Sequence, residues 1–463
     1  MERGMKTLNE EHDSRVQAGD TKTGDRVSEL PEDILSFILS LMSMRDAVQT
    51  RVLSRRWKNV SAPTSNLQFD LFTLFGINCD RNSLSIGSDN QSDGKCRFIK
   101  AVDQFLHLCR SPKLYSFKVC YSLGNDSECH IDRWISFAVR GHTEKLVLDF
   151  SGLPKGCELY NFPCNLLSHG KLPQLKHLCL QSCALRPSPD STNIFNSLKT
   201  LDLNMVPLEE DLNCILSGCV TLEWLRLTNC KLPVSFFICA QYLCLKSLIL
   251  DECHGAKKIE ISRPLTAFEY IGGMTNLSFV GAPSIEKVKL MLMRAYARGT
   301  DYMFHGLAKE LPSLQRLSLS LFTRDMMSIP ENMTKFYHLK ELDLIVILSL
   351  DFDLLSVISI LNAVPCLHTL NLAIRYSGPS SLQEKRRYTK QFYYDLKEVE
   401  ITGFRDECNA LDLVLYVLDN ALRLERMIIR WTHAAGMWMG ESRKKEVDDL
   451  LKEKAAHVEL IVL

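Results

Sequence analysis

Apolar residues recur along most of this chain in one six-residue pattern, with leucine at positions one, four and six in its clearest copies. The side chains of an extended segment alternate between two faces, so positions four and six predict a short strand with one buried face. Four copies follow one another, and their middle leucines are 23, 24 and 23 residues apart. These middle leucines are Leu178, Leu201, Leu225 and Leu248.

Weaker copies extend the pattern in both directions. A period of roughly 20 to 29 residues with this core is typical of leucine-rich repeats, which bury their leucines only by stacking. We therefore predict an α/β fold, a leucine-rich repeat solenoid with a curved parallel sheet and a helical or irregular outer layer. Near residues 257–281 two closely spaced cores, at Ile259 and Phe268, predict two short coils. The additional copies centre on Phe117, Leu146, Val288, Leu317, Leu342, Leu370, Val399, Met427 and Ile461.

A different pattern precedes the repeats. Between Asp25 and Val60, apolar residues recur three and four positions apart, as in amphipathic helices. Pro31 suits the first turn of a helix, and the acidic pair after it complements the helix dipole. Further helix starts at Ser43 and Ser54 predict a three-helix module. A module this small is near the lower limit for independent folding, so its surplus apolar surface suggests a docking partner.

The same N-terminal residues resemble an F-box. The resemblance rests on Leu30-Pro31, Ile34-Leu35, Ile38, the Val52-Leu53-Ser54 run and the closing Arg55-Arg56-Trp57-Lys58. In that family the segment docks on a Skp-type adaptor, which bridges to a cullin ubiquitin ligase, while the rest of the chain selects the protein to be ubiquitinated. The alternative is an ordinary helical cap on the following domain. The residues that this resemblance assigns to the docking surface, or to the core beneath it, are Leu30, Pro31, Ile34, Leu35, Ile38, Leu41, Val52, Leu53 and Trp57.

The C-terminal part, from Asp395 to Leu463, partly resembles the FBD region of plant F-box proteins through its strand, helix and strand pattern. Helices are predicted over 411–422 and 441–456, where they would cover the end of the sheet. The whole chain thus resembles plant F-box/leucine-rich repeat proteins. The predicted organisation is a disordered tail over 1–24, an F-box over 25–70, a linker and first cap over 71–112, leucine-rich repeats over 113–394 and a C-terminal cap over 395–463.

The residues between the leucines of each strand face outward and form the predicted concave face. Trp224 with Arg226 is the preferred anchor for a target protein, because Trp and Arg are enriched at binding hot spots. Stacked repeats would also bring several carboxylates into an acidic stripe that favours a basic partner. For any single residue, a plain solvated face is the alternative. The further candidates for target binding are Arg316, Glu341, Asp343, Glu398 and Glu400.

Composition limits the classes of partner. Lys plus Arg and Asp plus Glu are both 55, so no global field would attract nucleic acid or a membrane surface. The most apolar stretch, 342–367, is interrupted by aspartates and a proline, and the polar first residues resemble neither a signal peptide nor an anchor. Seventeen cysteines without a signal peptide indicate free thiols in a reducing compartment, the cytoplasm or the nucleus.

Three cysteines share one place in the repeat. Cys183, Cys230 and Cys253 each follow the last leucine of a core by three residues, where leucine-rich repeats use Asn or Cys. A small polar side chain there can hydrogen-bond the turning backbone, which predicts a structural role. Zinc binding is the alternative, but these spacings match neither paired CxxC motifs nor an HxxxH motif.

No catalytic motif accompanies these features, because phosphate loops, dinucleotide fingerprints, zinc-protease motifs and nucleophile elbows are all absent from the sequence. We therefore predict a non-catalytic subunit without cofactor or metal. Three hypotheses remain open: a substrate receptor of a cullin ligase, a leucine-rich scaffold whose F-box has become a structural cap, and a small-molecule co-receptor with a basic pocket in the horseshoe.

Overall fold

The chain divides into two compact units, Met1–Thr64 and Ser65–Leu463. The computed structural model describes residues 29–42, 46, 50, 65–77, 91–109, 113–154, 156–165, 175–187, 195–238, 244–262, 265–273, 275–280, 285–293, 302–323, 329–330, 332–348, 352–376, 391–405, 409–432 and 441–463.

The first unit contributes helix α1 (Glu32–Leu41), which begins where the sequence predicts. The carbonyl oxygen of Pro31 accepts hydrogen bonds from the backbone N–H groups of Ile34 and Leu35, at 3.0 and 3.1 Å, and so closes the first turn. Glu32 and Asp33 occupy that turn, where negative charge complements the helix dipole. Apart from the single residues Asp46 and Thr50, the predicted second and third helices of this module lie outside the described residues.

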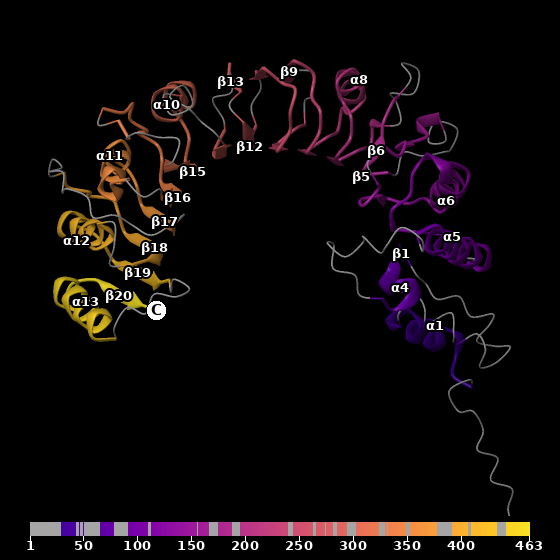
Figure 1. The fold of residues 1–463 in the computed structure, drawn as a ribbon, viewed down its shortest axis with the longest axis horizontal. Coiled ribbons are helices and arrows are strands. Elements are labelled where there is room, and N and C mark those ends of the chain that lie inside the picture. The colour runs from indigo at the N-terminus through magenta and orange to yellow at the C-terminus, as the bar shows by residue number, and fades with distance from the viewer. Residues whose placement is uncertain are drawn as a thin grey trace, which may run out of the picture. The chain divides into compact units, whose positions relative to one another are not determined.

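The second unit is built on one parallel sheet, and the part of the chain described here supplies fifteen strands to it in sequence order (Figure 1). Figure 1 shows this sheet following a curve, with its helices on the outer side. The strands are β1 (Asn66–Phe69), β2 (Ser116–Cys120), β3 (Lys145–Asp149), β5 (His177–Gln181), β7 (Thr200–Asn204), β8 (Trp224–Thr228), β10 (Ser247–Asp251), β12 (Ala267–Gly273), β14 (Lys287–Met293), β15 (Arg316–Phe322), β16 (Glu341–Leu348), β17 (Thr369–Tyr376), β18 (Glu398–Phe404), β19 (Arg426–Trp431) and β20 (Glu459–Val462).

The register of this sheet confirms the predicted repeat. Leu178 pairs with Leu201, Leu201 with Leu225, and Leu225 with Leu248, so the middle leucines form one buried row. Burial alternates along each of these strands, with the second and fourth residues inside and the others half-exposed. A one-residue slip would expose every leucine of a strand, which is why burial fixes the register so firmly.

Helices and short helical turns return the chain on the outer side of the sheet. Helix α6 shows the principle, because Ile131, Trp134, Ile135 and Ala138 share one buried face. The described helices of the second unit are α4 (Leu71–Phe75), α5 (Gln91–Leu108), α6 (Glu128–Arg140), α8 (Leu212–Ser217), α10 (Leu307–Glu310), α11 (Val357–Asn362), α12 (Ala410–Asn420) and α13 (Glu441–Lys454), with shorter turns η2 (Asn125–Ser127), η4 (Tyr302–Gly306) and η6 (Leu354–Ser356). No helix among these described residues has the length and apolar character needed to cross a membrane.

The start of the second unit differs from the sequence prediction. Strand β1 joins the sheet by pairing with β2, before the first predicted repeat. Its two buried residues, Leu67 and Phe69, are too few to stand out as a repeat copy. Helix α5 begins at Gln91, within the range 71–112 that the sequence predicts as linker and first cap, and its later turns carry the buried Phe98 and Val102.

The structure places one predicted core outside the main sheet and corrects one predicted register. Ile259 lies in β11 (Lys258–Ile261), which pairs with β9 (Ser235–Ile238) and β13 (Asn276–Ser278) in a separate three-stranded sheet. The stretch from 257 to 281 therefore adds one strand to the main sheet, β12, rather than two. In β20 the residue that pairs with Met427 is Leu460, not Ile461. A further small sheet joins β4 (Tyr160–Asn161) to β6 (Cys183–Ala184).

Candidate functional site

The first and third residues of successive strands form the concave face of the sheet. The first position of each strand pairs with the first position of the next, and the third with the third, so the side chains line up in two rows across the strands. All seven predicted target-binding residues lie in these rows and are exposed or half-exposed. They are Trp224 and Arg226 on β8, Arg316 on β15, Glu341 and Asp343 on β16, and Glu398 and Glu400 on β18.

The predicted acidic residues gather on two strands that flank β17. Glu341 and Glu398 share the first row with Thr369 between them, and Asp343 and Glu400 share the third row. Most of this charge already has a lateral partner. The contacts are Arg316 Nε to Glu341 Oε2 at 2.8 Å, Asn371 Nδ2 to Asp343 Oδ1 at 2.7 Å, and Arg430 Nε to Glu400 Oε1 at 2.8 Å.

The predicted anchor on β8 combines an aromatic ring with a tethered cation. Arg226 Nη2 lies 3.6 Å from Asp251 Oδ2 on β10, and its Nε donates to Thr228 Oγ1 at 3.3 Å. Burial raises the pKa of Asp202 on β7, and the positive charge of Arg226 opposes that rise. Trp224 stands in the first row between Thr200 and Ser247, two small side chains that leave its ring half-exposed.

A hollow of about 550 Å³ lies on the concave face between β1 and β8. Its lining includes Lys118, Lys145, His177, Asp202 and Trp224. Burial, followed by the positive charge of Lys145, holds the pKa of His177 below its usual value of 6.5. A second hollow, of about 350 Å³, lies between β10 and β16 and contains the Lys289–Glu269 ion pair at 2.6 Å.

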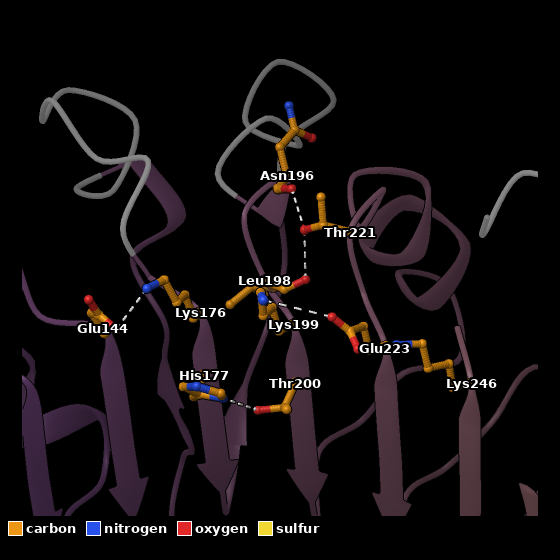
Figure 2. Close-up of polar contacts among 10 residues, drawn as sticks. All are labelled: Glu144, Lys176, His177, Asn196, Leu198, Lys199, Thr200, Thr221, Glu223 and Lys246. Carbon is orange, nitrogen blue, oxygen red and sulfur yellow. Dashed lines mark hydrogen bonds and ion pairs between the residues drawn. The ribbon is translucent and has the colours of Figure 1, made fainter. Parts of the chain in front are cut away.

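The edge where these strands begin carries its own ladder of charges, shown in Figure 2. Lys176 Nζ lies 2.9 Å from Glu144 Oε2, and Glu223 is shared between Lys199 at 3.8 Å and Lys246 at 2.7 Å. One row further in, His177 Nδ1 and Thr200 Oγ1 lie 2.8 Å apart. Each contact joins consecutive repeats, so the ladder fixes the side chains at the rim of the hollow.

A larger cavity of about 930 Å³ opens at the N-terminal end of the second unit. Leu71, Phe75, Tyr121 and Leu153 supply apolar walls, and Asp126, which is ion-paired with Lys95, lies at its rim. This cavity lies beside α4, α5 and the loops after β2 and β3. It is therefore distinct from the basic pocket in the horseshoe that the co-receptor hypothesis requires.

Helix α1 separates the predicted adaptor-binding residues into two groups. Leu35 is fully buried, whereas Ile34 is 46% exposed, Pro31 is exposed, and Leu30 and Ile38 are half-buried. Phe37, which the sequence prediction omitted, is 60% exposed. Its spacing of three residues from Ile34 places it on the same side of the helix and could have revealed it. The side chain of Leu41 and the residues Val52, Leu53 and Trp57 lie outside the described part.

The three cysteines of the repeat occupy the predicted turns. Cys183 Sγ donates to the carbonyl oxygen of Gln181 at 3.4 Å, and Cys230 Sγ contacts the carbonyl oxygens of Leu203 and Thr228, both at 3.3 Å. Cys253 Sγ donates to Leu227 O at 3.2 Å and lies 3.6 Å from Asp251 O. These bonds satisfy backbone carbonyls as the strand ends. No group of three or more His, Cys, Asp or Glu side chains arranged for a metal occurs among the described residues.

Thiol labelling tests the electrostatics of the concave face. Burial raises the pKa of Cys179, at the third position of β5, to about 12. At pH 8 a thiol with this pKa is thiolate in about one molecule in ten thousand, and thiolate is the reactive form. We expect iodoacetamide to modify Cys179 at least a hundredfold more slowly than the exposed Cys157, as followed by peptide mass spectrometry. Comparable rates would contradict the burial of this thiol.

A leucine-rich repeat solenoid preceded in the sequence by a helix with exposed apolar side chains, α1, is typical of F-box/leucine-rich repeat proteins. Residues 27–64 match the F-box domain, and residues 107–456 match the domain described as At1g61320/AtMIF1, LRR domain. The second match covers most of the chain, so the protein belongs to the At1g61320/AtMIF1 family of leucine-rich repeat domains and carries an F-box.

Several proteins of Arabidopsis thaliana are similar to this chain. The F-box/LRR-repeat protein At3g03360 is 31% identical over 218 residues, which are 45% of this chain and 40% of the relative. The F-box/FBD/LRR-repeat protein At1g13570 is 23% identical over 425 residues, which are 88% of this chain and 91% of the relative. The F-box/LRR-repeat protein At3g26922 is 28% identical over 314 residues, 66% and 93% of the two chains. Against At3g03360 and At3g52680, the match spans only 40% of the relative's length.

Proposed function

We propose that this protein is the substrate-recognition subunit of a cullin ubiquitin ligase. Its F-box would dock on a Skp-type adaptor, which bridges to the cullin, and its repeats would bind the protein to be ubiquitinated. The observation that carries this proposal is the outer side of α1, where Ile34 and Phe37 are 46% and 60% exposed. Exposed large apolar side chains on one helix are typical of a docking surface.

The subunit would contribute proximity rather than chemistry. It would hold a target near a ubiquitin-conjugating enzyme elsewhere in the complex. Proximity and orientation alone would then lower the activation barrier for ubiquitin transfer. We propose no catalytic residue, cofactor or metal for the chain, and no nucleic-acid or membrane partner. The cytoplasm or the nucleus is the proposed location, since free thiols at seventeen cysteines suit a reducing compartment.

Target binding is proposed for the concave face. Trp224 and Arg226 form its preferred anchor, and Arg316 belongs to the same surface. The carboxylates on β16 and β18 are proposed as a second contact site for basic side chains of the target protein. Those side chains would compete for the carboxylates with the arginines of neighbouring strands. These carboxylates are Glu341, Asp343, Glu398 and Glu400.

A single substitution on α1 tests the adaptor assignment. We expect Ile34→Glu to weaken co-purification with a Skp-type adaptor at least tenfold, because it places a charge on an exposed apolar contact without disturbing the core. Glu32→Gln, an exposed polar position on the same helix, is the matched control and should bind as the parent does. Both variants should keep the parent's melting temperature, measured by differential scanning fluorimetry.

Leu35 supplies the complementary variant. It is fully buried, so Leu35→Ala should destabilise the module itself and reduce adaptor binding through unfolding. Undiminished adaptor binding by folded Ile34→Glu would contradict the docking assignment on α1, whereas failure of the parent protein to bind any adaptor would favour the scaffold hypothesis.

A further inference from the structure

The first row of side chains on the concave face differs in charge between the two halves of the sheet. From β14 to β19 most charged side chains are joined laterally, as in Arg316–Glu341 at 2.8 Å and Arg430–Glu400 at 2.8 Å. From β1 to β12 the first row contains no carboxylate at all. The residues of that row are Asn66, Ser116, Lys145, His177, Thr200, Trp224, Ser247 and Ala267.

Two lysines in this half form no close ion pair among the described residues, although the positive charge of Lys118 helps to lower the pKa of Asp70. Lys145 is exposed in the first row of β3, and Lys118 is half-exposed in the third row of β2, next to it. With strands about 4.8 Å apart and two residues of offset, their Cα atoms lie about 8 Å apart. Two flexible ammonium groups at that separation can converge on one carboxylate or on two neighbouring ones.

Several acidic side chains of the neighbouring strands and loops have contacts of their own. Asp70 accepts from Gln68 Nε2 at 2.5 Å and from the Thr73 N–H at 2.6 Å. Glu144 holds Lys176 at 2.9 Å. Asp149 accepts from the backbone N–H of Ser151 at 3.1 Å. Asp202 also lines the hollow, where Arg226 is the positive charge that acts on it, so the lining carries two lysines against one carboxylate.

The same hollow ends in an apolar anchor. Trp224 lies at its β8 end, and Val147 and Cys179 line its floor between the lysines and the indole. From β3 to β8 there are three strand spacings, or about 14 Å, which an extended peptide covers in about four residues. The whole hollow, from β1 to β8, spans about 24 Å and accommodates about seven extended residues.

Resting on the proposed target-binding role of the concave face, we propose that the β1–β8 hollow binds an extended acidic segment of the target protein. A carboxylate of the segment contacts Lys118 and Lys145, and an apolar or aromatic side chain about four residues away packs on Trp224. The charge complementarity fixes the placement of the acidic end, and the aromatic anchor supplies most of the affinity.

Selection from a displayed library of random nonapeptides, panned on the full chain, tests this proposal. We expect the recovered peptides to be enriched in Asp or Glu, with an apolar or aromatic residue about four positions away. Recovery of basic or uncharged peptides, or of no peptide above background, would overturn the proposal.

Variants then locate the site by fluorescence polarisation with a recovered peptide. Lys118→Glu with Lys145→Glu should weaken binding at least tenfold, Trp224→Ala at least fivefold, and added salt should weaken the parent's binding by screening. Lys287→Glu reverses an exposed lysine in the first row of β14 and is the matched control, expected within threefold of the parent. Equal weakening by the control would show general charge attraction and overturn the assignment.

The double alanine variant of Lys118 and Lys145 removes both positive charges without adding negative ones, so it tests the same contact if charge reversal disturbs folding. It should also lose affinity while keeping the parent's melting temperature. Adaptor co-purification is measured on the same preparations. Peptides selected by a chain that fails to bind an adaptor would contradict the proposed ligase role alone, whereas adaptor binding without acidic peptides would contradict only this inference.

Discussion

Replacing Leu225 with alanine is expected to lower the free energy of unfolding of the repeat sheet by about 2 to 5 kcal/mol. Leu225 is fully buried on β8 between Leu201 on β7 and Leu248 on β10, so truncation removes packing on both sides. The cavity that remains adds to the lost transfer energy, because strands held by ladder hydrogen bonds cannot close around it. Chemical denaturation followed by circular dichroism measures the loss.

The neighbouring residue supplies the control. Trp224 points to the opposite face of the same strand and is half-exposed, so Trp224→Ala should cost about 1 kcal/mol despite removing the larger side chain. Because each repeat contacts mainly its neighbours, hydrogen exchange in Leu225→Ala should accelerate first in β7, β8 and β10. Equal loss of protection in β17 to β19 would contradict this local picture.

The leucine ladder was predictable because burial alone determines it. A strand whose alternate positions must be apolar can be aligned on its neighbours without any coordinates, as the Leu178, Leu201, Leu225 and Leu248 row demonstrates. The same logic fails where alternation is ambiguous. Leu460, Ile461 and Val462 are consecutive apolar residues, so either register of β20 satisfies the pattern.

The outer layer shows a second limit. Ile259 has the alternation of a sheet strand because β11 is one, but it belongs to the small sheet of β9, β11 and β13. Periodicity identifies a half-buried strand and does not say which sheet it joins. Only the spacing of 20 residues from Leu248 to Phe268 reveals that Ile259 lies between two strands of the main sheet.

The concave face could be predicted in its residues but not in its contacts. Facing outward follows from strand alternation, which placed Trp224, Arg226 and the acidic candidates correctly on one surface. Their partners lie 25 to 30 residues away, as in Arg226–Asp251 and Arg430–Glu400. Such pairs depend on register and rotamer together, so the difference between the paired charges and the unpaired Lys118 and Lys145 emerges only in three dimensions.

Substitution of Gly403 by alanine is expected to destabilise the C-terminal repeats by at least about 3 kcal/mol. Gly403 has a φ of 77°, and a Cβ atom there would lie 2.0 Å from the carbonyl oxygen of Ile374 on the adjacent strand. Both the left-handed backbone and the close approach require glycine. Hydrogen exchange of β17 to β19 should accelerate by roughly a hundredfold for a local loss of this size.

The reason lies in what the glycine allows. The β18–β19 register shifts between Thr402 and Phe404, and this bulge turns the fully buried Phe404 ring edge-on to Trp431, with centroids 4.7 Å apart. Gly273→Ala is the matched control, because a Cβ at this end of β12 meets nothing within 4 Å and its φ is not positive. It should be neutral or stabilising by less than about 1 kcal/mol, through the entropy of the unfolded chain. A Gly403→Ala protein as stable as this control would show that the bulge accommodates a Cβ atom without loss of stability. The Phe404–Trp431 contact would then not depend on glycine at position 403.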